Sequence, residues 1–227
     1  MNNSALSRPL RFLIYFLIII LVYFIYVAAN RGVGDVNSYH ARVIMDSWAS
    51  GKKVVEKNDW DAAHQSLLSA LDRSPENPDY LTLLGNLYEW RVTGKVPDSP
   101  EIVADYRKAL GLYQQALKTR PAFAFYWANV AVVKSILTEV DEEFYLAVDR
   151  SLVLGAWDPG VQIKIADATL GIWYLLDEHG WEKMVENVEH GLESNPSAIM
   201  KMAKQYQVLN KLCAKLRRTE TMLSYCK

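Results

Sequence analysis

The sequence has little excess charge of either sign and little proline or glycine. It contains 25 basic and 26 acidic residues, for a net charge of −1, so its charge gives no reason to expect a nucleic-acid partner. Its eight prolines and eleven glycines are not gathered into a Gly-, Ser- or Gln-rich tract, which would be typical of a linker or a disordered tail. We therefore expect one mostly folded domain that does not bind nucleic acid.

Sequence signatures of catalysis are also missing. No Gly-rich phosphate loop, HExxH, GxSxG or paired CxxC motif occurs. The histidines lack the i, i+4 spacing of a metal site and are predicted to be surface or capping residues: His40, His64, His179 and His190. Asp59 and Asp61 could act as an acid pair on a glycan, but they lie at a predicted helix start, where aspartates cap N–H groups. We expect no enzymatic activity, no metal and no cofactor.

One long hydrophobic run contrasts with these absences. Residues 12–29 carry no charge, and as a helix they would be about 27 Å long, near the thickness of the hydrocarbon core of a bilayer. A buried helix of a soluble domain is disfavoured because the run has no polar face. A cleaved signal peptide has support from Arg8, Arg11 and the small residues at 27–29. The length of the run and its tyrosines favour a transmembrane anchor over residues 12–30.

The charges that flank this anchor hardly decide its orientation. Arg8 and Arg11 lie in the predicted short tail of residues 1–11, and Arg31 and Arg42 follow the run, so the positive-inside count is close to a tie. The first pair lies closer to the run, which favours a cytoplasmic N-terminus and an exported C-terminal domain. The sequence thus predicts a single-pass protein of the bacterial inner membrane with a periplasmic domain.

Cysteine is scarce, and both copies lie near the C-terminus. Cys213 and Cys226 suit one disulfide in an oxidising compartment. On a continuous helix their Cα atoms would be about 20 Å apart, whereas a disulfide needs about 5.5 Å. A bridge therefore requires a turn, for which residues 217–219 are suitable. Two unrelated buried thiols are the alternative.

Most of the remaining chain carries a repeated pattern, Ala-x3-(large apolar)-x2-Ala-Leu-x3-Pro. It occurs twice in full, at Ala63, Leu67, Ala70, Leu71 and Pro75 and at Ala109, Tyr113, Ala116, Leu117 and Pro121. Weaker copies precede Pro159 and Pro196. The equivalent glycines Gly51 and Gly85 are 34 residues apart, whereas the prolines of the two full copies are 46 apart. This difference predicts an insertion over residues 91–102, where glycine and proline indicate a loop.

These residues resemble the tetratricopeptide repeat, whose unit is two antiparallel helices with small residues at their crossing and a proline after the second. The resemblance covers about residues 38–196, although Lys134 stands where the family has a tyrosine and Gly191 where it has an alanine. It implies an all-α fold in which about four tetratricopeptide-like helix pairs over residues 31–197 form an α-solenoid after the anchor. A C-terminal helix and cysteine-containing tail would follow over residues 198–227.

A second resemblance rests on the segment SLVLGAWDPGVQ, residues 151–162. With the single span and degenerate repeats, it is similar to the VpsP family of bacterial polysaccharide-biosynthesis proteins, which are membrane-anchored accessories. The resemblance implies a non-catalytic scaffold that supports exopolysaccharide synthesis or export through protein contacts. A structural interpretation also fits: Gly155 ends a helix, Asp158 caps the next and Pro159 begins it. A periplasmic folding or translocation helper, associated with the secretion machinery, is the alternative function.

Stacked helix pairs usually bind partners on the concave surface lined by the first helix of each pair. Counting from the glycine positions predicts a binding groove lined by Asp79, Thr82, Asn86 and Glu89 from one helix and by Phe125, Ala128, Val132 and Ser135 from the next. A clamp for the C-terminal carboxylate of a peptide is not expected. The resemblance would place basic or amide residues at positions that Trp48, Leu83 and Phe125 occupy.

Overall fold

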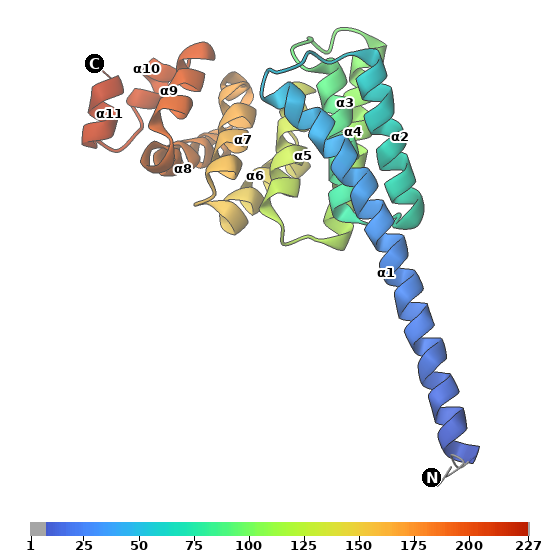
Figure 1. Ribbon diagram of the computed structural model, residues 1–227. Helices are drawn as coiled ribbons and strands as arrows, with labels where there is room; N and C mark the ends of the chain where they lie inside the picture. The colour runs from blue at the N-terminus through green and yellow to red at the C-terminus, as the bar shows by residue number, and fades with distance from the viewer. Residues whose placement is uncertain (1–7, 227) are drawn as a thin grey trace. The chain divides into compact units, whose positions relative to one another are not determined.

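The computed structural model describes residues 8–226, and over this range the chain is all-helical, with no strand (Figure 1). The α-helices are α1 (Arg8–Ala49), α2 (Lys57–Arg73), α3 (Pro78–Val92), α4 (Pro100–Thr119), α5 (Ala124–Ile136), α6 (Glu142–Gly155), α7 (Pro159–Leu170), α8 (Glu178–Ser194), α9 (Pro196–Gln205), α10 (Leu209–Cys213) and α11 (Glu220–Tyr225). A 3-10 helix, η1 (Trp173–Leu175), precedes α8. The predicted all-α class is confirmed. Of the tail predicted over residues 1–11, the first seven residues lie outside the described range, and the rest is helical.

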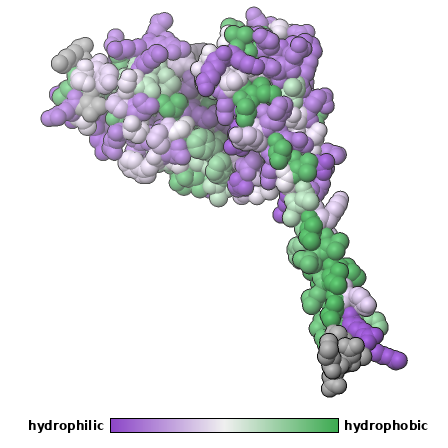
Figure 2. Space-filling view, viewed as in Figure 1, coloured by the Kyte–Doolittle hydropathy of each residue, from purple (hydrophilic) through white to green (hydrophobic). Residues whose placement is uncertain are grey.

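The apolar run lies in the first part of α1, a single helix of 42 residues. At about 1.5 Å per residue the helix is roughly 63 Å long, which exceeds the thickness of a bilayer. Its most apolar window has a mean hydropathy of 2.8 and is not buried, and Figure 2 shows this stretch as a continuous hydrophobic surface. α1 is therefore long and apolar enough to cross a membrane. Residue 30, the predicted end of the anchor, is not a break, because the helix continues to Ala49.

The chain divides into two compact units, Met1–Pro75 and Glu76–Lys227. In the first unit, α2 packs antiparallel to the second part of α1, with contacts of 2.7 to 3.3 Å between Asn30 and Arg73, His40 and Ser66, and Lys53 and Asp59. Buried residues recur every three or four positions, at Gly34, Ser38, Ala41, Met45 and Trp48 in α1 and at Trp60, Ala63, Leu67 and Ala70 in α2. This spacing places them on one face of each helix. The small residues among them, Gly34, Ser38, Ala41, Ala63 and Ala70, allow the backbones to approach.

The second unit contains three further helix pairs, α3 with α4, α5 with α6, and α7 with α8. Side chains that precede the helices accept hydrogen bonds from the first turn at Asn77, Ser99, Asp141, Asp158, Asp177 and Asn195. Proline is the first residue of α3, α4, α7 and α9. These caps and prolines start each helix where the sequence has them, because they satisfy or remove N–H groups that lack a helical partner.

The loop predicted over residues 91–102 is shorter in the structure. α3 continues to Val92 and α4 begins at Pro100, so only residues 93–99 are non-helical. The Arg91 guanidinium forms an ion pair with the buried carboxylate of Asp105, which joins the two helices next to the loop. The extra residues therefore lengthen the helix pair as well as its connection.

The two helices of this pair cross closely at Gly85. A Cβ atom at this position would lie 2.5 Å from Cε1 of the fully buried Tyr113, which is closer than two carbon atoms can approach. The spacing of small residues in the sequence thus has a direct packing reason. Gly155 has the same role in α6, where a Cβ atom would lie 2.7 Å from Cβ of Ala124.

The C-terminal region differs in detail from the helix and cysteine-containing tail predicted over residues 198–227. Three short helices, α9, α10 and α11, occupy it instead. The chain turns after α9, where Gln207 adopts a φ of 57°, and again over residues 214–219. This second turn brings Cys213 and Cys226 together in a disulfide with a Cα separation of 5.7 Å. The turn that a bridge requires is therefore present.

Candidate functional site

Asp79, at the start of α3, is exposed but has partners on neighbouring elements. It accepts a 2.7 Å hydrogen bond from the Tyr126 hydroxyl of α5 and forms a 3.2 Å ion pair with Arg120. Burial, followed by the hydrogen bond and charge of Asp79, raises the pKa of Tyr126. The phenol therefore stays protonated and donates to the carboxylate. Asp79 joins successive helix pairs within the second unit.

Asn86 and Glu89, one turn apart on α3, meet the buried Tyr113 of α4. The Tyr113 hydroxyl lies 2.7 Å from Asn86 Oδ1 and also contacts Glu89 Oε1. Burial raises the pKa of Glu89, although the Lys164 charge and the Tyr113 hydrogen bond oppose that rise. Burial and the Glu89 charge also raise the pKa of Tyr113 well above its ordinary value. The structure thus brings two predicted groove residues together around one phenol.

Residues of α7 complete this arrangement, and sequence reasoning missed them. Lys164 and Asp167 both act electrostatically on Glu89, and the Tyr206 hydroxyl, just after α9, lies 2.5 Å from Asp167 Oδ1. We name this set the inner polar cluster: Asn86, Glu89, Tyr113, Lys164, Asp167 and Tyr206. The i, i+3 spacing of Lys164 and Asp167 could have indicated that both lie on one side of a helix. The groove positions were counted from glycines of the repeat pattern, and that pattern has no glycine in this region.

The residues predicted to line the groove from α5 are mostly closed off. Ala128, Val132 and Ser135 are exposed by only 0%, 7% and 7%, so the expectation that they face a ligand is not met. α5 is packed against α4, α6 and α7, and these neighbours cover most of its surface. Phe125 is half-buried, and its ring lies over Gly160 of α7. Thr82 of α3 is also half-buried.

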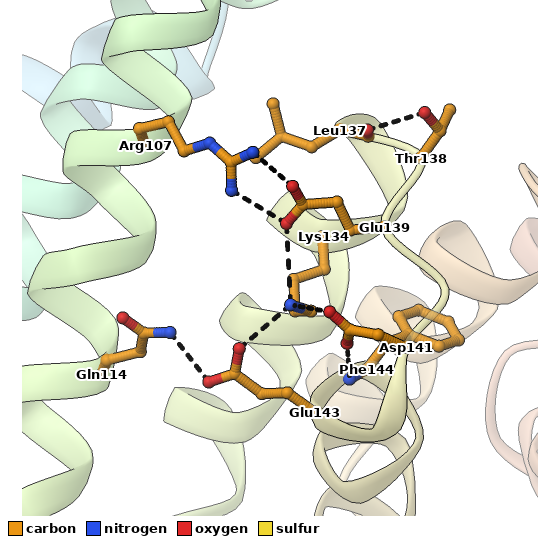
Figure 3. A network of polar contacts seen from close by, with 9 residues as sticks. All are labelled: Arg107, Gln114, Lys134, Leu137, Thr138, Glu139, Asp141, Glu143 and Phe144. Atoms are coloured by element: carbon orange, nitrogen blue, oxygen red, sulfur yellow. Dashed lines mark hydrogen bonds and ion pairs between the residues drawn. The ribbon is translucent and has the colours of Figure 1, made fainter.

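Lys134, at a position where the resemblance predicts a tyrosine, is the most enclosed cation among the described residues of the second unit. Its side chain is only 3% exposed, and its Nζ lies 2.8 Å from Asp141, 3.0 Å from Glu143 and 3.6 Å from Glu139 (Figure 3). All three carboxylates come from the α5–α6 turn or the first turn of α6. The position therefore holds a charge with several partners where the repeat pattern would hold an aromatic ring.

Two residues of α4 extend this arrangement, which we name the Lys134 network. Arg107 forms two hydrogen bonds with Glu139, and Gln114 Nε2 donates to Glu143 over 2.8 Å (Figure 3). Burial opposes the charge of Lys134, but its carboxylate partners outweigh burial and raise its pKa. Arg107 in turn lowers the pKa of Glu139. Each member has a partner, so the network fixes α4, α5 and α6 rather than offering a reactive group.

A hollow of about 650 Å³ lies on the outer face of α8. We name it the α8 groove; α8 contributes Glu178, Trp181, Glu182, Val185, Glu186 and Glu189 to its lining. The spacing of three and four residues places these side chains on one side of the helix. The groove thus combines four carboxylates with an indole ring and a small aliphatic side chain.

The opposite wall of the α8 groove is the chain's own C-terminal segment. Lys215 Nζ lies 5.7 Å from the Trp181 ring centroid, and Arg217 forms a 2.6 Å ion pair with Glu189. The backbone N–H of Arg217 also donates to Glu189 over 2.9 Å. Burial alone would raise the pKa of Glu189, but the hydrogen bonds and charge of Arg217 lower it. A second hollow of about 330 Å³ shares Glu189 and Arg217.

No protein-family model matches this chain, and no curated protein matches it either. The resemblances carried by its sequence motifs therefore remain interpretations of those motifs. Within residues 8–226, no three His, Cys, Asp or Glu side chains are grouped so as to hold a metal ion. The described residues thus contain two kinds of charged group. The charged groups of the inner polar cluster and the Lys134 network have internal partners, whereas the α8 groove has carboxylates at the surface.

The segment of residues 151–162 has a structural explanation at nearly every position. Gly155 ends α6, and Asp158 caps α7 by accepting hydrogen bonds from two backbone N–H groups, as expected. Gln162 is 1% exposed and donates to the Ala156 carbonyl over 2.7 Å. Val153 and Trp157 are exceptions, because they are 79% and 67% exposed. The Trp157 ring lies tilted against the His190 ring, with 4.5 Å between the centroids.

The two aspartates considered as an acid pair have ordinary ionic partners. Asp59 lies in the first turn of α2 but does not cap it, because Glu56 occupies the N-cap position. Asp59 pairs with Lys53 at 3.3 Å, and Asp61 pairs with Lys57 at 2.5 Å. The predicted capping role is therefore wrong in detail, although an acidic residue in the first turn still favours the helix dipole.

Each of the four histidines has its own neighbours. His40 lies 2.9 Å from Ser66, and His179 lies 3.1 Å from Asp149. The His64 ring stacks on Trp60, and the His190 ring lies tilted against Trp157. Each histidine thus has a different local environment in a different part of the chain.

Proposed function

We propose that this protein is a membrane-anchored, non-catalytic scaffold that supports bacterial exopolysaccharide synthesis or export through protein contacts. The observation that carries the proposal is the continuity of α1, which extends from an apolar segment into the first helix pair without a break. A continuous helix attaches a folded domain to a membrane more rigidly than a flexible linker would. The polysaccharide context comes from the resemblance of residues 151–162.

The placement of the domain in the periplasm belongs to the same proposal. The Cys213–Cys226 disulfide supports it, because disulfides persist in oxidising compartments and are rare in the bacterial cytosol. The tetratricopeptide-like character of the helix pairs supports a role in protein contacts, since stacked helix pairs present extended surfaces to partners. The scaffold would hold components of the polysaccharide machinery near the inner membrane.

The distribution of charge also supports a scaffold rather than an enzyme. The charged groups of the inner polar cluster have partners within that cluster. Those of the Lys134 network likewise have partners within the network. A catalytic site would need a reactive group that reaches a substrate in a cavity. The internal partners instead favour a rigid framework with its interaction surfaces on the outside.

The proposal is tested by affinity capture of the full-length protein from mild-detergent membranes after brief crosslinking. Recovery of a polymerase, flippase, glycosyltransferase or export protein is expected, together with loss of polymer on deletion. Recovery of the translocon with many unrelated exported clients would contradict the proposal and favour a folding or translocation helper. Unchanged polymer after deletion would contradict it as well.

A matched pair of variants separates anchoring from partner contact. In one, residues 31–227 are exported behind a cleavable signal peptide; in the other, the same residues follow an unrelated transmembrane helix. We expect the second variant to restore polymer in a deletion strain better than the first. Equal restoration by the released domain would show that the anchor is dispensable.

A further inference from the structure

The α8 groove differs from the other charged regions because part of its charge has no internal partner. Glu189 is paired with Arg217, and Glu186 with Lys183 at 2.9 Å. Among the described residues, no hydrogen bond or ion pair engages Glu178 or Glu182. Carboxylates without partners beside a hollow of about 650 Å³ favour a ligand with positive charge.

The chain's own C-terminal segment already shows how this face of the fold binds cations. Lys211 Nζ lies 3.9 Å from the Trp173 ring centroid, and Lys215 Nζ lies 5.7 Å from that of Trp181. Arg217 forms its ion pair with Glu189 in the same stretch. Three basic residues of one short segment thus contact neighbouring helices, two through aromatic ring faces and one through a carboxylate. Further carboxylates of the groove lie along α8 beyond the part that this segment covers.

We propose that the α8 groove docks a basic, amphipathic segment of a partner protein. Lysine or arginine side chains of that segment would pair with Glu178 and Glu182 and would share Glu186 with Lys183. An apolar side chain would pack on Trp181 and Val185. The four glutamates exceed the two cations of the lining, Lys215 and Arg217. This surplus makes the groove complementary to a basic segment and repulsive to an acidic one.

The disulfide helps to hold the second wall of the groove in place, together with the contacts of Arg217 with Glu189. Lys215 and Arg217 lie between Cys213 and Cys226, so the bridge closes the segment that carries them. Breaking it releases this segment from one of its two fixed ends and increases its conformational freedom. Docking is therefore strongest in the oxidised protein. This inference depends on the proposed function only in that the occupant is a protein.

The test uses the full-length protein in nanodiscs of zwitterionic lipid, so that the membrane does not attract basic probes. The probe is a fluorescent synthetic helix with lysines on one face and leucines on the other. We expect saturable binding that weakens with salt, because surface charges are screened. A scrambled peptide of the same composition and an acidic counterpart with glutamates should bind at least about fivefold more weakly.

Two variant proteins locate the binding. Glu182→Gln with Glu186→Gln should weaken the probe about tenfold, since each lost ion pair contributes up to about 1 kcal/mol. The control, Glu76→Gln with Glu101→Gln, removes the same charge from exposed positions outside the groove and should change binding less than about twofold. Equal effects of the two variants would overturn the proposal, as would equal binding of the scrambled peptide or no binding.

Reduction provides an independent measurement on the same protein. Cys213→Ser with Cys226→Ser, or treatment of the wild type with a reductant, should weaken the probe by about threefold to tenfold. Unchanged affinity would show that the wall carried by the disulfide is not part of the site. These binding results do not depend on polymer or captured proteins. The docking site can therefore fail while the scaffold proposal holds, and the reverse is equally distinguishable.

Discussion

The Lys134 network and the α8 groove each gather three or more carboxylates, but they differ in what opposes those charges. In the network, a lysine that is 3% exposed contacts Asp141 and Glu143 within 3.0 Å. In the groove, Glu178 and Glu182 are exposed, and neither has a hydrogen bond or an ion pair among the described residues. Similar side chains therefore serve two purposes, one fixing the fold and the other leaving charge for a partner.

The largest effect is expected from Lys134→Met, which removes the cation of the network. The change leaves Glu139, Asp141 and Glu143 close together without Lys134. Because the side chains of Asp141 and Glu143 are 54% and 40% exposed, solvent screens these contacts, and each of the three ion pairs contributes up to about 1 kcal/mol. We expect the free energy of unfolding to fall by about 3 kcal/mol. Chemical denaturation of the full-length protein in mild detergent, followed by tryptophan fluorescence, measures it. The exposed Lys118→Met is the control, and an equal loss there would contradict a special role for the network.

A smaller and more local effect is expected from Cys213→Ser with Cys226→Ser. A bridge across a sequence separation of 13 stabilises by about 2 to 3 kcal/mol, mainly by restricting the unfolded chain. We expect faster hydrogen exchange confined to α10, α11 and the turn between them. Increased exchange in α5 or α6 would contradict the view that the groove wall and the Lys134 network are independent.

Much of the fold could be predicted because its signals are local. Asp158 and Pro159 were predicted to start a helix and do so, and the repeat pattern places a small residue at Gly85, where two helices cross closely. Pro100 starts α4 in the same way, although the loop predicted over residues 91–102 included it. A local pattern also required a turn between the two cysteines. Each of these features depends on backbone chemistry or packing within one helix pair.

The site was less predictable because accessibility depends on neighbours that the local pattern does not specify. Counting along α5 correctly placed Val132 and Ser135 on one side of the helix, but adjacent helices bury that side. The glutamate stripe of α8 is readable in the sequence as spacing alone. Its opposite wall, with Lys215 and Arg217, requires the fold of the C-terminal segment, for which the sequence predicted only a helix and a cysteine-containing tail.

The inner polar cluster predicts a pH dependence of the opposite sign to that of the Lys134 network. Burial raises the pKa of Glu89 above its ordinary value of about 4.5, so the folded protein holds a proton that the unfolded chain has released. Stability from this group is therefore complete below pH 4.5 and is lost as the pH rises through the raised value. By contrast, Glu139 and Asp141 have lowered pKa values and lose stability as the pH falls through them.

Glu89→Gln separates these contributions, because the amide oxygen can still accept the Tyr113 hydrogen bond without a charge. We expect the variant to lose the decline in stability above pH 4.5 while keeping the acid decline. The measurement is the difference in unfolding free energy between variant and wild type across pH. A constant difference would contradict a titrating Glu89, whose facing charged groups are Lys164 and Asp167.

The smallest effect on stability is expected from Glu182→Gln with Glu186→Gln in the α8 groove. Glu182 has no ion pair to lose, and the Lys183–Glu186 pair is a partly exposed i, i+3 contact, whose contribution is about 0.5 kcal/mol or less. Relief of repulsion along the glutamate stripe acts in the opposite direction. We therefore expect the free energy of unfolding to change by less than about 0.5 kcal/mol, measured as for Lys134→Met. A loss as large as that of Lys134→Met would mean that the groove carboxylates hold the fold together, and the difference between the two regions would disappear.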